Sequence, residues 1–461
     1  MDSSGGQVQL RRVLGFWQAY AIAVGLIVAG TSMVSLANYF GNVGPAFIIS
    51  AAVAGFACIC IAMSYAELAA AIPGAGMVAD YTLPAMGRSM AIFGVLIGYI
   101  VMVTFAGSCE TFIAGLCVEQ VWGIPYKLVA AVLLILFLVL NLIGVEFFAN
   151  CQLILDAIKV PALVILGILG LLEIGSVNPT APIEFAPNGW GVVATSMVGG
   201  IWLYIGLEYV CPMAEEIKDP GKNVPRAMIA GVATVFASNM LFGEAIIRYV
   251  PLEILATSDV PQLIGAEAMF GRAGMIIIAI ATIVAGASAA DSHMAALPRM
   301  LYGLARDGML PKIFAYLHPK FRTPWVGIFF AFICLSMPFL INLNIDYIMS
   351  FIGMACASWL VSYIIVQVDL IILRKKHPRM RRPFKSPLYP VPQVIGIVLC
   401  LYIIATSGTE ALIGMAVCVI IFLAYSILWV KFKMKKPCFT PLKFEEMGEI
   451  NIIVDKEGES A

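Results

Sequence analysis

The sequence predicts an all-α polytopic membrane protein with twelve transmembrane helices. Its 461 residues are 61% hydrophobic and only 12% charged, whereas soluble proteins carry about 25% charged residues. Mean hydropathy is +0.95, and twelve apolar segments are long enough to cross a bilayer. A net charge of zero gives no indication of a nucleic-acid partner. The lipid bilayer is therefore the expected environment of the chain.

The twelve segments follow one another along almost the whole chain. They run over residues 14–40, 45–72, 89–118, 127–144, 151–174, 193–214, 226–248, 273–303, 325–343, 347–372, 391–409 and 411–430. The first has no small-residue cleavage site, so we expect a first span and not a cleaved signal peptide. Ten of the eleven cysteines lie inside apolar runs, which is typical of packing residues and predicts neither metal nor cofactor binding.

The placement of Lys and Arg predicts the orientation in the membrane. If the N-terminus is cytoplasmic, 24 of the 28 basic residues fall on cytoplasmic pieces. Only Lys127, Arg248 and Arg272 then lie outside, and Lys159 lies within a span. We therefore expect a plasma-membrane (inner-membrane) protein with residues 1–13 and the tail 431–461 in the cytoplasm. A monomer or a weak homodimer is the default, because no partner motif is evident.

The sixth segment carries three glycines, two aromatic residues and a carboxylate between residues 199 and 208. Glycine weakens a helix and frees backbone groups, which are tolerated at membrane depth only beside protein or a wet cavity. Glu208 is costly there unless it faces a pathway. We interpret residues 199–208, with Trp202, Ile205 and Gly206, as a helix break that lines a binding site. The alternative is a packing helix softened by glycine with a shielded Glu208.

The first segment is interrupted in the same way, with glycines and hydroxyls at residues 25–32. Interruptions five spans apart are the pattern of two inverted five-helix repeats whose first helices meet at the bilayer midplane. We expect the repeats to occupy residues 14–174 and 193–372, with two further helices in 391–430. Substrate contacts are expected at the first break, from Ala29, Gly30, Thr31 and Ser32.

Charged residues inside other spans mark further candidates. Lys159 lies about nine residues into a span, where loss of water makes it a usable proton carrier. Asp156 is on the same helix face and Ser288 is a possible acceptor, so these three form the expected coupling group; a static pair that only fixes packing is the alternative. Glu110 and Asp291 could each hold an amine, or could instead bond to a neighbouring helix.

Three further polar residues are expected to lie outside the substrate and coupling groups. His293 is interpreted as a packing histidine, with a proton relay as the alternative, and Glu67 as structural. Asp369 is expected near a span end, where it reaches water.

Three motifs resemble the amino acid–polyamine–organocation transporter superfamily. Residues 65–76 (YAELAAAIPGAG) are similar to its second-helix signature, in which Ala-Glu-Leu precedes a Pro-x-x-Gly turn. Residues 215–226 (EEIKDPGKNVPR) resemble its loop between helices six and seven, and residues 306–311 (RDGMLP) its loop after helix eight. The first break and residues 213–216 are also similar to ethanolamine-permease-like members. The resemblance covers nearly all of the hydrophobic chain.

The resemblance implies a LeuT-like fold in which substrate lies between broken helices one and six. Trp202, Ile205 and Glu208 fall where arginine/agmatine and putrescine exchangers carry an aromatic gate, a contact and a carboxylate. Lys159 matches the lysine that stands in place of Na⁺ in sodium-independent members. The chain departs from the usual Gly-Ser-Gly of the first break, because it has Ala29-Gly30-Thr31.

We therefore expect a secondary transporter of an amino acid or small amine that works by alternating access, with proton coupling and without sodium. An obligate exchanger of the same class is the main alternative. A membrane enzyme or a channel is the alternative of another class; no paired nucleophile and base, no Walker loop and no repeated pore loop is evident in the sequence. The intramembrane acids favour a substrate with a positive end, while free amides at the breaks leave a zwitterion open.

Overall fold

The computed structural model describes residues 14–74, 76–143, 148–174, 183–214, 216–321, 323–341 and 344–443. Within these ranges the regular structure is helical, apart from the isolated β-bridge between Leu14 and Ile217 and a further bridge position at Met380. The prediction of an all-α polytopic membrane protein is confirmed. Glu215 and Ala75, which belong to two of the motifs, lie outside the described residues, as do residues 1–13 and 444–461.

Nine helices or helix runs among the described residues are long and apolar enough to span a membrane. These are α3 (Phe47–Ala71), the run Arg88–Trp122, α7 (Tyr126–Ile143), α8 (Phe148–Leu171), the run Trp190–Met213, α11 (Pro220–Ile246), α13 (Pro261–Arg306), α15 (Ile345–Lys376) and the run Thr409–Met434. A bent pair, α1 (Phe16–Ile27) with α2 (Gly30–Val43), makes a tenth. The shorter apolar helices α14 (Trp325–Leu335) and α16 (Val391–Ala405) coincide with the two remaining predicted segments. The count of twelve spans and the inverted repeats stay predictions.

Several spans consist of more than one helical piece. The third is α5 (Arg88–Val95), the π-helices η1 (Leu96–Ile100) and η2 (Val103–Gly107), and α6 (Ser108–Trp122). The sixth is α9 (Trp190–Thr195), α10 (Met197–Trp202) and the 3₁₀-helix η3 (Leu207–Met213), and α13 is interrupted at Gly271. Other pieces are α4 (Val78–Met86), α12 (Leu252–Thr257), η4 (Lys312–Ala315), η5 (Met337–Leu340), α17 (Thr409–Leu428) and η6 (Trp429–Met434).

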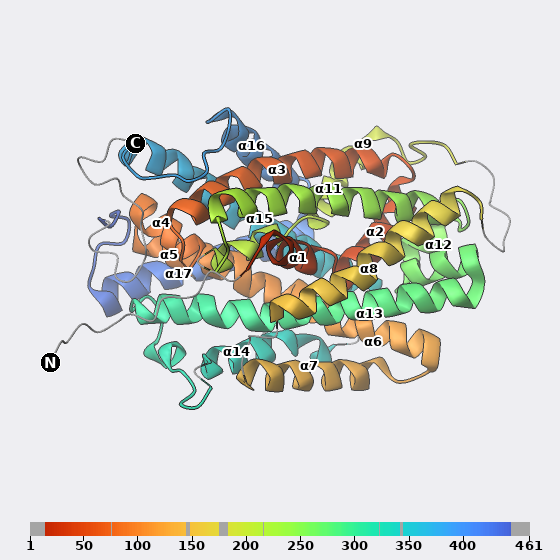
Figure 1. Ribbon diagram of the computed structural model, residues 1–461, viewed down its shortest axis with the longest axis horizontal. Coiled ribbons are helices and arrows are strands. Elements are labelled where there is room, and N and C mark those ends of the chain that lie inside the picture. The colour runs from red at the N-terminus through yellow and green to blue at the C-terminus, as the bar shows by residue number, and fades with distance from the viewer. Residues whose placement is uncertain are drawn as a thin grey trace.

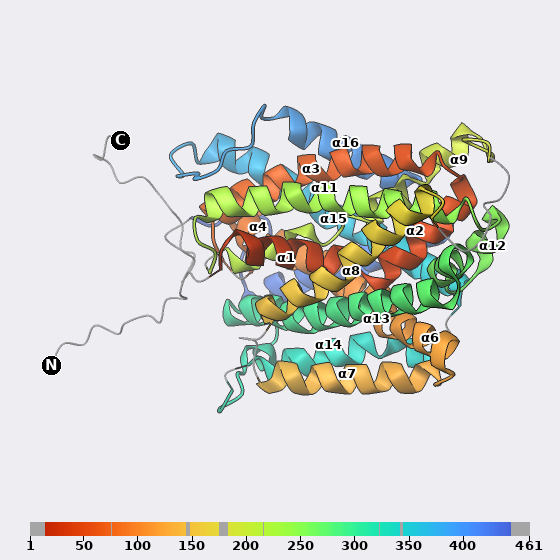
Figure 2. The same ribbon diagram turned by 45° about the vertical axis from the view of Figure 1, so that its right-hand side comes forward.

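The long helices lie side by side along the long axis of the molecule, with the α1–α2 pair among them at the centre (Figures 1 and 2). Burial follows this arrangement, since the most apolar window of Arg88–Trp122 is 78% buried and that of Thr409–Met434 only 11%. Outer helices expose large apolar side chains such as Ile135 on α7 and Ile420 on α17. Such faces are suited to contact with lipid.

Both ends of the described chain lie at one end of the bundle. The backbone N–H of Leu14 donates to the carbonyl of Glu216, and the backbone N–H of Ser89 donates to the carbonyl of Cys438. The indole of Trp429 donates to the carbonyl of Gly308 in the basic loop after α13. The basic loops predicted to be cytoplasmic therefore share one end with both chain ends, while the side of the membrane that this end faces stays a prediction.

Glu67 ties α3 to the connection between α15 and α16. Its carboxylate is fully buried and accepts hydrogen bonds from Arg374 Nε at 2.8 Å and from the backbone of Ser386 at 2.7 Å. Arg382 Nε lies 3.1 Å from the same carboxylate. A buried charge of this kind is held only with such partners, and this geometry is consistent with the structural role expected for Glu67.

Asp369 corrects one expectation. It was expected to reach water near a span end, but it is fully buried on α15 and accepts a hydrogen bond from Thr82 Oγ1 at 2.6 Å. The reason is α4, a short helix between the second and third spans that packs against α15 and covers this end of it.

Candidate substrate and coupling site

The first span is broken at Val28, whose backbone is no longer helical, and at Ala29, which is extended, and the axes of α1 and α2 differ by 56°. A helix end leaves backbone groups without intrahelical partners, carbonyls at the C-terminus of α1 and N–H groups at the N-terminus of α2. Burial in a membrane protein makes such groups expensive unless other groups bond to them. The break predicted from the glycines at residues 25–32 is confirmed.

Lys159 on α8 bonds to the C-terminal end of α1. Its side chain is fully buried, and Nζ donates to the carbonyl of Gly25 at 2.6 Å. Ser288 Oγ on α13 lies 3.4 Å from Nζ, and Asp156 Oδ1 lies 3.1 Å from it. A cation at a helix C-terminus is favoured by the helix dipole. The structure brings together the three residues that were predicted to form the coupling group.

Glu110 on α6 bonds to the other side of the break. Its carboxylate accepts hydrogen bonds from Gly30 N at 2.8 Å and from Thr31 Oγ1 at 2.5 Å, and Thr31 N lies 3.3 Å away. Ala29 stands at the N-cap of α2 and supplies no side-chain cap, so a residue from another helix fills that role. Ala29 and Ser32 are buried at the same break.

The sixth span is broken after Trp202. Residues 203–206 form turns, and Gly206 has φ = 108°, a conformation that side-chain-bearing residues rarely adopt. A Cβ at Gly206 would stand 2.7 Å from Leu26 Cδ2 on α1. The two breaks therefore contact each other through this glycine, and the predicted discontinuity of the sixth span is confirmed.

Glu208 lies in the first turn of η3 and bonds to two tyrosines. Tyr363 Oη on α15 donates to one carboxylate oxygen at 2.5 Å, and Tyr99 Oη on η1 donates to the other at 3.3 Å. The Tyr363 hydroxyl also accepts from Gly206 N at 3.3 Å. These contacts link the broken stretch, its carboxylate and two other helices. The sequence did not single out Tyr99 or Tyr363.

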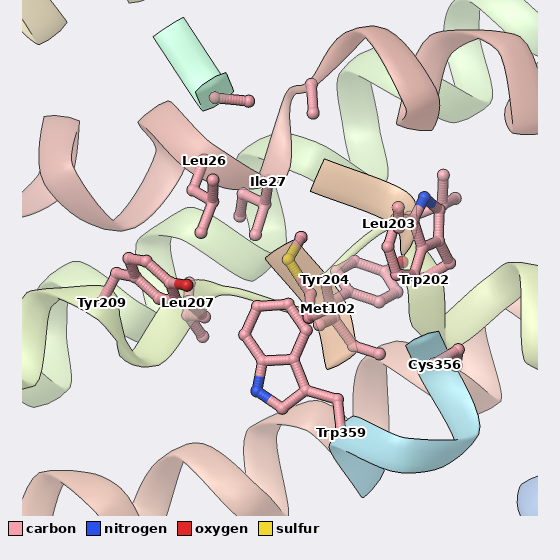
Figure 3. Close-up of a cluster of buried hydrophobic side chains, with 14 of the residues drawn as sticks. Leu26, Ile27, Met102, Trp202, Leu203, Tyr204, Leu207, Tyr209, Cys356 and Trp359 are labelled. Carbon is pink, nitrogen blue, oxygen red and sulfur yellow. The ribbon is translucent and has the colours of Figure 1, made fainter. Parts of the chain in front are cut away.

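Apolar side chains fill the space between the two breaks, as Figure 3 shows. Leu26 and Ile27 come from the end of α1, and Trp202 and Leu207 from the two sides of the sixth-span break, with Trp359 of α15 beside them. Ile205 is also buried in this cluster. Trp202 Nε1 is buried and has no hydrogen-bond partner among the described residues, which leaves a donor for a ligand.

Asp291 and His293 both lie on α13, where Asp291 faces α7 and His293 faces η3. Asp291 accepts a hydrogen bond from Asn141 Nδ2 of α7 at 2.6 Å, so its bonded neighbour belongs to an outer helix and not to either break. His293 is fully buried and packs edge-on against Tyr209. Of the predicted substrate residues, Asp291 is thus the one that the structure does not bring to the breaks.

Two recesses approach the breaks from opposite ends of the bundle. One, with about 420 Å³ that include open solvent, is lined by α1 before its break and η3 after its break, through residues that include Ile22, Leu26, Tyr209, Met213 and Arg299. The other, with about 900 Å³ that include open solvent, is lined by α2, α9 and α10, through residues that include Asn38, Tyr39, Ser196 and Val198. Each recess therefore uses one half of each broken helix.

The chain is similar over most of its length to known transporters. The family model described as amino acid permease matches residues 14–423. An uncharacterized transporter of Rhizobium meliloti is 26% identical over 93% of this chain and 94% of its own length. Two Bacillus subtilis proteins are each 24% identical: a methylthioribose transporter over 90% of this chain and 94% of its own, and a branched-chain amino acid permease over 93% and 95%.

These findings confirm the superfamily predicted from the three motifs, and they exclude the enzyme that was kept as an alternative. A match across nearly the whole hydrophobic chain establishes the family of the protein but does not identify its substrate. The chain belongs to the amino acid permease family of multi-pass membrane transporters.

Proposed function

We propose that this chain is a sodium-independent secondary transporter of the plasma membrane that carries a small amine or amino acid and couples its movement to protons through Lys159. The observation that supports the proposal best is the fully buried ammonium of Lys159. It contacts the α1 carbonyl of Gly25, Asp156 on its own helix and Ser288 of α13 at once. A change in its charge would alter the contacts that hold α1 beside the break.

Alternating access follows from the two recesses. Each is lined by one half of each broken helix, so tilting of the helices about the breaks would open one recess and close the other. The apolar cluster of Leu26, Trp202 and Trp359 stands between the breaks, where a substrate would displace or contact it. We propose that the substrate lies at Gly30, Thr31, Gly206 and Glu208. The ring of Trp202 would act as a gate to this position.

The relatives leave the cargo open, because one is named for methylthioribose and another for branched-chain amino acids. A thermal-shift screen of the purified protein against amino acids, decarboxylated amines and amino alcohols identifies the ligand class. A ligand that binds only the folded state raises the apparent stability according to its concentration relative to Kd. The best ligand is then used, in labelled form, for uptake into proteoliposomes.

The test of coupling compares Lys159→Ala with the wild type. We expect wild-type uptake to rise with an inward proton gradient and to be unaffected by a sodium gradient. Lys159→Ala should fold, bind the ligand in the thermal-shift assay and lose the response to the proton gradient. Lys312→Ala, at an exposed position in η4, is the control and should behave as the wild type.

Two results would overturn parts of this proposal. Uptake by Lys159→Ala that still responds to pH removes Lys159 from coupling. Uptake that requires unlabelled substrate inside the vesicles, whatever the pH, replaces the proton-coupled transporter with an obligate exchanger.

A further inference from the structure

The N-terminus of α2 is a place that attracts anions. Its first N–H groups have no intrahelical acceptor and lie at the positive end of the helix dipole. In discontinuous helices of transporters, such a terminus points at the anionic group of the substrate. In this chain the terminus already holds a carboxylate, because Glu110 accepts hydrogen bonds from Gly30 N and from both the backbone and the side chain of Thr31.

Glycines on the neighbouring helices leave space for Glu110 at this position. The side chain is 1% exposed, and a Cβ on Gly30 would stand 3.0 Å from its Oε2. Gly286 on α13 admits the backbone of α6, since a Cβ there would stand 2.5 Å from the carbonyl oxygen of Glu110. The approach of α6 thus needs a glycine at position 286 of α13, and Gly30 of α2 leaves room for the carboxylate at the α2 amides. The contact between Glu110 and the α2 amides is therefore supported by the packing around the break.

We propose that Glu110 takes the place of a substrate carboxylate, and that the site therefore selects small organic amines and amino alcohols over the corresponding amino acids. This inference rests on the proposed transport function and names the substrate class of that same site. A substrate carboxylate would have to displace Glu110 from the Gly30 and Thr31 amides or lie beside it as a like charge. Among the described residues at this break, α2 provides the only helix N-terminus that could bind a substrate carboxylate, and Glu110 already occupies it.

The charges around the breaks favour the same class. Glu110, Glu208 and Asp156 supply three carboxylates, and Lys159 supplies one ammonium that already bonds to Gly25 and Asp156. An organic ammonium group gains from this excess of acids. Trp202, in the apolar cluster at the sixth-span break, offers such a cation the face of its ring, which attracts positive charge.

The wild-type protein provides the first test through matched pairs of ligands. The pairs are L-serine with ethanolamine, L-leucine with 3-methylbutylamine, and L-arginine with agmatine, so each member differs from its partner only by a carboxylate. Loss of one charge-assisted contact corresponds to roughly tenfold or more in Kd. We expect the best amine to bind at least about tenfold more tightly than its parent amino acid, measured by thermal shift and by competition for uptake.

Variants of Glu110 provide the second test. Glu110→Ala exposes the α2 amides, so its thermal stability should rise with sodium acetate but not with sodium chloride of equal ionic strength. Glu208→Ala is the matched control, because it removes a carboxylate from the same core that has no contact with those amides, and acetate should not stabilise it. A folded Glu110→Ala protein that does not respond to acetate would overturn the proposal.

If Glu110→Ala does not fold, Glu110→Gln replaces it, since this change keeps the size of the side chain and removes its charge. Discrimination against the amino acid of the best pair should then fall at least about tenfold, and unchanged discrimination overturns the inference. Stronger binding of amino acids than of amines by the wild type overturns the inference and leaves the transporter intact. Absence of both binding and uptake for every ligand would instead overturn the proposed function.

Discussion

Among the described residues, Tyr363 makes two side-chain hydrogen bonds to the sixth-span break. Its hydroxyl donates to Glu208 at 2.5 Å and accepts from Gly206 N at 3.3 Å. Tyr363→Phe keeps the ring packing and removes both contacts. A hydrogen bond to a charged group contributes about 1.5–3 kcal/mol, so the change should destabilise the protein by about that amount in a detergent unfolding experiment and slow uptake.

Tyr99→Phe is the matched comparison for this prediction. Its hydroxyl donates to the other oxygen of Glu208 over a longer distance of 3.3 Å and makes no contact with Gly206 that the structure records. Its loss should cost about 1 kcal/mol or less. Equal destabilisation by the two changes would show that Tyr363 has no special role at the break.

At the residue scale, the sequence predicts charges better than it predicts their partners. Lys159 and Glu110 stand out because a charged group inside an apolar run is costly and must have a reason. Tyr99 and Tyr363 do not stand out, because aromatic residues are ordinary in spans and the pairing joins residues far apart in the chain. Asp291 was expected at the site with its neighbour Ser288, yet Asp291 bonds to Asn141 of α7 while Ser288 lies beside Lys159 of α8. Spacing along α13 alone does not predict which neighbouring helix each residue contacts.

At the scale of elements, the two breaks depend on each other through Gly206. Alanine at this position meets two costs: φ = 108° strains any residue with a Cβ, and that Cβ would stand 2.7 Å from Leu26 Cδ2. Backbone strain of this kind costs about 1–2 kcal/mol, and overpacking adds about 1–3 kcal/mol. We expect Gly206→Ala to destabilise the protein by about 2–5 kcal/mol and to abolish uptake.

Gly123→Ala separates the two costs. Gly123, at the C-cap of α6, is also in the left-handed region, with φ = 73°, but a Cβ there would have no heavy atom within 4 Å. This variant should lose only the strain energy, about 1–2 kcal/mol, and retain uptake. If both variants lose the same stability in thermal unfolding, the contact between the broken spans does not contribute to it.

Sequence patterns predicted these breaks because glycine and hydroxyl residues in mid-span conflict with an ordinary apolar helix. The same method missed α4 and α12, which are short helices between spans, because their few turns give too little periodicity to recognise. The omission matters for Asp369, since α4 is the element that supplies Thr82 and covers this carboxylate. Local helices in connections are fixed by packing on the bundle, and that packing cannot be read from the connection alone.

At the scale of the whole molecule, the remaining question is which side of the membrane the basic end of the bundle faces. The loops around Arg306 and Arg374 lie at this end together with residues 429–443 and Leu14, whereas α9 and α12 lie at the opposite end (Figure 2). Basic residues are retained on the cytoplasmic side during insertion. The basic end should therefore face the cytoplasm.

Cysteine labelling in intact cells and in inside-out vesicles checks this orientation. In a Cys438→Ser background, Lys436→Cys at the basic end should react with a membrane-impermeant maleimide only in inside-out vesicles. Glu184→Cys at the opposite end should react only in intact cells; both positions are exposed. The remaining described cysteines are buried or lie within apolar helices, where an aqueous reagent does not reach them. The reverse labelling pattern would invert the topology, and the recess at Arg299 would then open to the outside and the recess at Asn38 to the cytoplasm.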